Sequence, residues 1–70
     1  MSEYISNEVS TLRMNKGITQ EELAEKVGVS RQTIISIEKG NYTPSILLAL
    51  KISKFFGLPV EKVFTIRYAK

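Results

Sequence analysis

Two neighbouring side chains, Arg31 and Gln32, have hydrogen-bonding chemistry that can distinguish one nucleic-acid base from another. A guanidinium can donate two parallel hydrogen bonds to guanine, and a carboxamide can pair with adenine in the same two-point manner. Both residues follow Ser30, a residue type that favours the start of a helix. The first turn of a helix in the DNA major groove lies against base edges. The pattern therefore indicates a helix that presents its first turn to DNA.

A helix that begins at Ser30 also brings residues one turn further along to the same side. The candidate base-reading residues are Ser30, Arg31, Gln32, Ile35 and Ser36. The side chain of Ile35 either packs on a thymine methyl group or is a partly exposed aliphatic group beside the core. The sequence leaves both interpretations of Ile35 open.

The stretch from Gln20 to Glu38 predicts the two helices that would position these side chains. Its apolar residues recur three or four positions apart, so they share one face within each helix. These residues are Leu23, Val27, Ile34 and Ile37. Gly28 can adopt the left-handed conformation that ends the first helix. We interpret residues 20–38 as a helix-turn-helix motif.

Capping residues predict the limits of the helices. Thr19 and Glu22 have the spacing of a capping box at the start of the motif. Outside the motif, we expect a helix from a cap at Ser6 to about Lys16 and another from a cap at Thr43 or Ser45 to about Phe56. A short last helix should open at Pro59 and carry Val60, Val63 and Phe64. Pro44 suits the first turn of the second of these helices. The expected inward stripe of that helix is Ile46, Ala49, Ile52 and Phe56, with Leu48 beside it.

The end of the chain changes to the spacing of a strand. Phe64, Ile66 and Tyr68 alternate with other residues, as in a β-strand. A single strand is not stable in water, so this one would pair with residues 2–5, and the alternative is a frayed tail. We expect one all-α domain of five helices over residues 1–70. The sequence does not decide whether the two ends of the chain form a two-stranded antiparallel sheet.

Several runs of residues, taken together, are similar to one known family. They are Arg13, ITQEELAEKVGVSRQTI, IEKGNYTPS and LALKISKFFGLPVEKVF, and they cover roughly Val9 to Phe64. In this register the chain resembles the Cro and phage-repressor (XRE) type of helix-turn-helix regulator. The resemblance implies a lambda-repressor-like fold, double-stranded DNA as a partner, and a structural ion pair between Arg13 and Glu38.

A second group of residues is expected to bind DNA phosphates. The members are Gln20, Thr33, Lys39, Asn41 and Tyr42. Gln20 stands at a helix start, where free backbone donors also point outward. The resemblance implies a further phosphate clamp at Lys39, Asn41 and Tyr42. The alternative for each residue is a solvated surface position, and the Tyr42 ring can instead pack on the following helix.

Apolar residues outside the expected core predict self-association. They are Leu47, Leu50, Phe55, Val60, Phe64, Ile66 and Tyr68. Exposed apolar clusters usually mark contacts with partners. We expect a homodimer built from residues 58–70 and part of the helix before them. Such a dimer would place two reading helices about 34 Å apart, one turn of DNA.

Composition argues against several classes of function. Without cysteine or histidine the chain has no thiolate metal site and lacks the commonest general base, and it has no phosphate-cradling glycine loop. We expect no enzyme, cofactor, metal or small-molecule ligand. The net charge of +3 permits a polyanionic partner without requiring one. No segment resembles a membrane span or a signal peptide, which predicts a cytoplasmic protein.

Together these features predict a sequence-specific transcriptional regulator, a repressor that binds a palindromic operator as a homodimer. Activation stays open, because Glu21, Glu22 and Glu25 could contact RNA polymerase. The alternative is an antitoxin-type protein-interaction module that also binds DNA. Its mark would be an extended tail beyond the domain.

Overall fold

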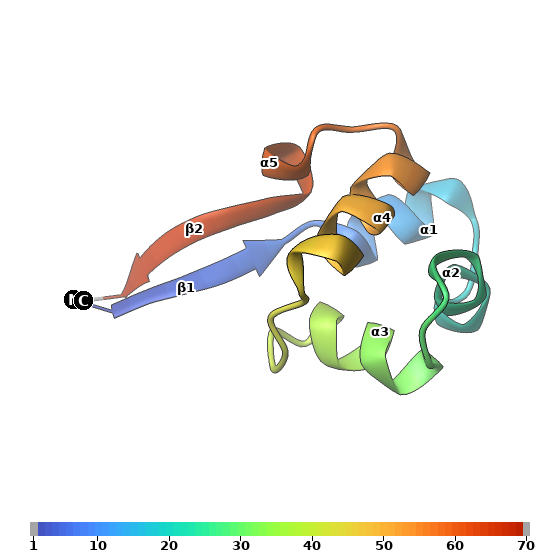
Figure 1. Ribbon diagram of the computed structural model, residues 1–70, viewed down its shortest axis with the longest axis horizontal. Helices are drawn as coiled ribbons and strands as arrows, with labels where there is room; N and C mark the ends of the chain where they lie inside the picture. Colours follow the sequence, from blue (N-terminus) through green and yellow to red (C-terminus); the bar gives the residue numbers. More distant parts are fainter. Residues whose placement is uncertain (1, 70) are drawn as a thin grey trace.

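The computed structural model describes residues 2–69, which form five helices and one two-stranded sheet (Figure 1). The order is β1 (Ser2–Asn7), α1 (Val9–Lys16), α2 (Gln20–Val27), α3 (Arg31–Glu38), α4 (Ile46–Phe56), α5 (Val60–Val63) and β2 (Phe64–Ala69). Met1 and Lys70, the outer limits of the predicted domain and tail, lie outside the described residues. The helices gather into one body, from which the sheet projects as a ribbon, so the molecule measures 36 × 23 × 22 Å.

Aliphatic side chains from all five helices form the core. They are Val9, Leu23, Ala24, Val27, Ile34, Ile37, Leu48, Ile52 and Val63. The apolar residues predicted to share a face within α2 and within α3 are all buried. The prediction for α4 was wrong at Ile46, which is 79% exposed. The buried face of α4 runs through Leu48 and Ile52, and Ile46 lies about 200° around the helix from Leu48.

The predicted caps of the motif are confirmed. The Glu22 backbone N–H donates to Thr19 Oγ1 at 3.0 Å, and the Thr19 N–H donates to Glu22 Oε1 at 2.9 Å. Ser30 and Ser45 cap α3 and α4, so Pro44 precedes the cap of α4 and is not in its first turn. Gly28 ends α2 with φ of +76°, a conformation that a residue with a Cβ adopts only under strain. This turn sets the direction of α3 relative to α2.

The predicted cap of α1 at Ser6 was wrong. Ser6 lies in β1, opposite Thr65, so it cannot cap a helix that begins at Val9. The N-cap residue is Glu8, whose side chain makes no capping bond, but Asn7 Oδ1 accepts from the Val9 backbone N–H at 3.1 Å. Its Nδ2 also donates to the carbonyl of Ile37 at 3.0 Å. Asn7 therefore joins the end of β1 both to the start of α1 and to the last turn of α3.

The ribbon has a more apolar and a more polar face, and it confirms the predicted pairing of the chain ends. β1 and β2 are antiparallel, with Ile5 opposite Ile66 and Glu3 opposite Tyr68. Directly opposed residues share a face. The face that we call apolar carries Ile5, Phe64, Ile66 and Tyr68, together with Glu3 and Asn7. The face that we call polar carries Ser6, Thr65 and Arg67, together with Tyr4, and Arg67 Nε donates to Ser6 Oγ at 3.2 Å. β1 extends two residues further than predicted.

Replacing Asn7 with aspartate should lower the free energy of unfolding by about 1–2 kcal/mol. Aspartate keeps the acceptor for the Val9 N–H but cannot donate to the Ile37 carbonyl. It also places a negative charge at the negative end of the α3 dipole. Urea denaturation measures the loss, with Thr11→Ala on the exposed side of α1 as the control. Equal stability of Asn7→Asp and the wild type would show that the Asn7–Ile37 bond contributes nothing.

Candidate nucleic-acid interface

One side of α3 is buried and the other faces solvent. Ile34 and Ile37 are completely buried, whereas Arg31 and Gln32 are exposed. Ile35 and Ser36, one turn later, are half-buried on the exposed side. We call the exposed side, made of Arg31, Gln32, Ile35 and Ser36, the reading face. An eight-residue helix is about 12 Å long, close to the width of the major groove.

The residues at the start of α3 divide into two roles. The Ser30 hydroxyl accepts from the Thr33 N–H at 3.2 Å and lies 3.0 Å from the Thr33 hydroxyl. The Ser30 hydroxyl therefore caps the helix, and the Thr33 hydroxyl is hydrogen-bonded to it. Within residues 2–69 the Arg31 guanidinium forms no hydrogen bond or ion pair, and the Gln32 amide has only a 3.5 Å contact with Ser36 Oγ. Arg31 and Gln32 are therefore available to a ligand.

The predicted phosphate-binding residues lie at three places around α3. Gln20 is the first residue of α2, and Thr33 lies in the first turn of α3. Lys39, Asn41 and Tyr42 follow the end of α3 and are all exposed. Tyr42 and Leu47 of α4 both line a shallow hollow, and 46% of Tyr42 is exposed. The exposed Lys39 and Arg31 stand at opposite ends of the reading face.

Arg13 and Glu38 form an ion pair that joins α1 to the end of α3. Arg13 Nε donates to Glu38 Oε2 at 2.8 Å and Nη2 donates to Oε1 at 3.2 Å. The third donor, Nη1, bonds the carbonyl of Ile18 at 2.9 Å. Only 14% of the Arg13 side chain and 7% of the Glu38 side chain are exposed. The hydrogen bonds that Arg13 donates to Glu38 raise the pKa of Arg13 against the opposing effect of burial, which favours the charged guanidinium.

Gln20 also contacts the Arg13–Glu38 ion pair, and these three residues form one cluster. The sequence did not indicate this contact. Its Nε2 donates to Glu38 Oε1 at 3.0 Å. The carboxylate of Glu38 therefore receives hydrogen bonds from α1 and from the start of α2. Gln20 and Glu38 are 18 residues apart, and only the fold brings them together. No spacing within one helix could have revealed this contact.

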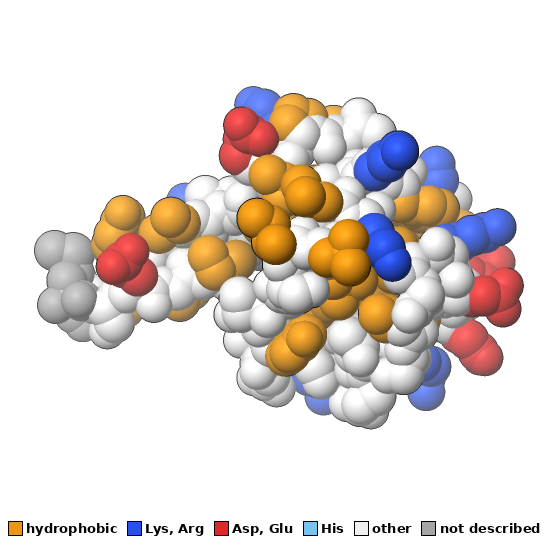
Figure 2. Space-filling model, viewed as in Figure 1, with side chains coloured by type: hydrophobic (Ala, Val, Ile, Leu, Met, Phe, Trp, Pro, Cys, Tyr) orange, Lys and Arg blue, Asp and Glu red, His pale blue; other side chains and the backbone are white. Residues whose placement is uncertain are grey.

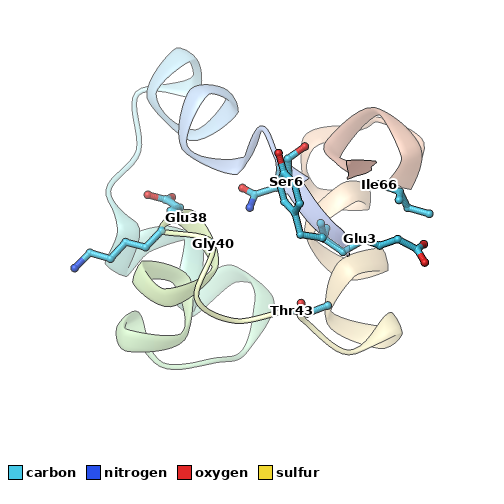
Figure 3. Close-up of a pocket in the computed structure, with 10 residues that line it drawn as sticks. Glu3, Ser6, Glu38, Gly40, Thr43 and Ile66 are labelled. Carbon is cyan, nitrogen blue, oxygen red and sulfur yellow. The ribbon is translucent and has the colours of Figure 1, made fainter. Parts of the chain in front are cut away.

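An open hollow of about 700 Å³ lies between β1 and the loop after α3 (Figure 3). Glu3 and Ser6 line it from β1, Ile66 from β2, and Gly40 and Thr43 from the loop. Glu38 forms part of its wall, but the carboxylate is already bonded to Arg13 and Gln20. No cluster of three or more possible metal ligands occurs within residues 2–69.

No helix in the described part of the chain has both the length and the apolar character to cross a membrane.

The exposed side of α3 carries polar groups suited to a large polar ligand. Gln20 at the start of α2 and Lys39 in the loop after α3 flank these groups. A helix exposed in this way can enter the major groove of DNA.

Comparison with known proteins agrees with this geometry. The family model described as helix-turn-helix matches residues 9–63. The chain is 55% identical over 60 residues to an uncharacterized HTH-type transcriptional regulator of Methanocaldococcus jannaschii, across 86% of this chain and 91% of that protein. It is 33% identical over 58 residues to the cryptic phage CTXphi transcriptional repressor RstR of Vibrio cholerae, across 83% of this chain and 52% of RstR.

The fold is similar to a solved structure as well. The restriction-modification controller protein C.AhdI of Aeromonas hydrophila superposes with a TM-score of 0.72 and 28% sequence identity, across 77% of this chain and 82% of that chain. The matched family model spans the core helices and the reading face. The chain therefore belongs to the helix-turn-helix family, of the Cro and phage-repressor type that its sequence resembles.

Proposed function

We propose that this protein is a cytoplasmic transcriptional regulator that binds specific sequences of double-stranded DNA through the reading face of α3. The observation that carries the proposal is the pairing of exposed Arg31 and Gln32 with buried Ile34 and Ile37 on the opposite side of the same helix. The core holds the helix, and the free side chains suit guanine and adenine edges. The name of RstR as a repressor supports repression by occupation of an operator.

The anchoring residues complete the proposed interface. Gln20, Lys39, Asn41 and Tyr42 are proposed to bind phosphates on either side of the groove, and Ile35 to pack on a thymine methyl group. Ser30 and Thr33 act in this proposal mainly as the helix cap, because their hydroxyls are engaged with each other. Phosphate contacts supply affinity and register, whereas the reading face supplies sequence preference.

We also propose that two copies bind together. Leu47, Leu50, Ile66 and Tyr68 are each at least 49% exposed. Figure 2 shows apolar side chains over α4 and along the ribbon. A two-stranded ribbon is marginally stable alone, and cover on its apolar face would stabilise it. Val60, Phe55 and Phe64 are half-buried, so they would form the inner border of this interface. A two-fold dimer implies a palindromic operator.

Replacing Ile66 with glutamate should weaken self-association about a hundredfold or more, because the charge would be buried in an apolar contact. Thr65→Glu is the matched control, since Thr65 is also exposed but lies on the polar face of the ribbon. Sedimentation at micromolar concentration should find wild type and Thr65→Glu as dimers and Ile66→Glu as a monomer. If all three proteins have the same mass, the ribbon is not part of a dimer interface.

Selection of bound sequences from random duplex DNA tests the proposed function. The expected product, which we call the selected duplex, contains two short half-sites related as a palindrome. Centres about 10 base pairs apart would match two reading helices on one side of the DNA. Enrichment of a single undivided site would contradict the two-copy arrangement. No enrichment of any sequence would overturn the proposal that the protein is a sequence-specific regulator.

A further inference from the structure

We infer that Glu38 is a positioning residue for phosphate binding, because its carboxylate fixes the amide of Gln20. The inference rests on the proposed function. It assigns Glu38 a role beyond the ion pair with Arg13: one hydrogen of Gln20 Nε2 is held by Glu38, and the other is directed toward the DNA backbone.

The direction of the Gln20 amide follows from the chemistry of its partner. A carboxylate only accepts hydrogen bonds, so the NH₂ group of the amide, rather than its oxygen, must face Glu38 Oε1. This removes the two-fold choice that a surface glutamine ordinarily has. The amide nitrogen carries two hydrogens, and the 3.0 Å bond to Glu38 uses one of them. The second hydrogen remains a donor of fixed direction.

Glu38 is itself held more firmly than the group it orients. Arg13 donates to both of its carboxylate oxygens, at 2.8 and 3.2 Å, and Arg13 is tied in turn to the Ile18 carbonyl. The Glu38 side chain is 7% exposed, whereas Gln20 is half-buried at the surface. Burial is therefore greatest at the ion pair and smaller at the Gln20 amide. A donor supported in this way is already oriented before DNA arrives, which lowers the entropic cost of binding.

The charges of the cluster are also suited to a phosphate neighbour. A lone carboxylate beside a phosphate would repel it, but the positive charge of Arg13 balances that of Glu38 at a 2.8 Å contact. Gln20 therefore presents a directed donor from a neutral cluster, and the exposed Lys39, next to Glu38 in sequence, supplies net positive charge. On this account Gln20→Ala lowers affinity without changing the salt dependence of binding, which follows the number of Lys and Arg contacts.

The test replaces single phosphates of the selected duplex by neutral methylphosphonates, one position at a time. For the wild type, we expect affinity to fall about tenfold at the phosphate that accepts from Gln20. Gln20→Ala should bind the normal and neutralised duplexes equally at that position, which identifies the contact. Glu38→Gln should show the same loss of sensitivity there, to within about twofold, because the amide is no longer held in one direction.

Arg13→Lys is the matched control. It loses the forked contact of the guanidinium with Glu38 but keeps a positive charge beside the carboxylate, which stays balanced and able to accept from Gln20. It should lower the melting temperature, yet keep the wild-type sensitivity at the Gln20 phosphate. If Glu38→Gln melts below the assay temperature, Glu38→Asp serves instead, since it keeps the charge but shortens the side chain by one methylene.

Three outcomes would overturn the inference. Glu38→Gln could keep the sensitivity that Gln20→Ala loses, which would make Glu38 structural only. Arg13→Lys could lose it as well, which would assign the effect to the weakened ion pair. Gln20→Ala could retain it, which would show that Gln20 does not contact phosphate. Failure of the proposed function is distinct from these three results, because the wild type would then yield no selected duplex at all.

Discussion

Replacing Arg31 with alanine should weaken binding to the selected duplex about a hundredfold or more, since each of two copies loses a base contact of about 1–3 kcal/mol. The preference at one base position in each half-site should disappear with it. Arg31 is exposed, belongs to the first turn of α3 and forms no ion pair or hydrogen bond within residues 2–69. Its removal should therefore leave the free energy of unfolding nearly unchanged.

Competition between the selected duplex and single-base variants of it measures this effect. Lys39→Ala is the control, because Lys39 is also exposed and basic but stands at the other end of α3. Lys39→Ala should lower the affinity for all DNA sequences by the same factor. It should also reduce the salt dependence of binding by about one phosphate contact per copy. A uniform loss for Arg31→Ala, with the base preference intact, would show that Arg31 binds phosphate and reads no base.

Glu38→Ala should lower the free energy of unfolding by about 2 kcal/mol, between the values for exposed and fully buried ion pairs. The substitution leaves the Arg13 guanidinium, whose side chain is 14% exposed, without its partner and releases Gln20. The loss is a large part of the roughly 5 kcal/mol expected for a small domain. The order of base preferences should not change, because Glu38 lies outside the reading face.

Urea denaturation measures the stability of Glu38→Ala, with Glu21→Ala as the control. Glu21 is an exposed carboxylate in the first turn of α2, where its removal costs only a few tenths of a kcal/mol up to about 1 kcal/mol. Equal unfolding midpoints for Glu38→Ala and the wild type would contradict the structural role of the ion pair.

Local signals in the sequence predicted the helix-turn-helix correctly. The Thr19–Glu22 capping box, the glycine at position 28 and the apolar spacing within α2 and α3 each act over one or two turns. The side of α3 that would face DNA follows directly from that spacing. The same reasoning failed at Ile46, because α4 is apolar on more than one side and spacing alone did not determine which stripe is buried.

Contacts between distant segments could not be predicted in the same way. Asn7 bonds Ile37 across 30 residues, and Gln20 bonds Glu38 across 18. Ser6 is of a residue type that often caps helices, but pairing with β2 draws it into the sheet, and α1 begins after Glu8 with Asn7 accepting from the Val9 N–H. The alternation from Phe64 to Tyr68 predicted a strand, whereas its register with β1 depends on where α1 and α5 place the two ends.

We propose above all that α3 distinguishes one DNA sequence from another. This can be tested by the ratio of dissociation constants for a scrambled duplex and for the selected duplex, measured at 0.15 M salt by fluorescence anisotropy. We expect a ratio of about a thousand or more, as for specific DNA-binding proteins. A ratio near one, with both duplexes bound through phosphate contacts alone, would contradict it.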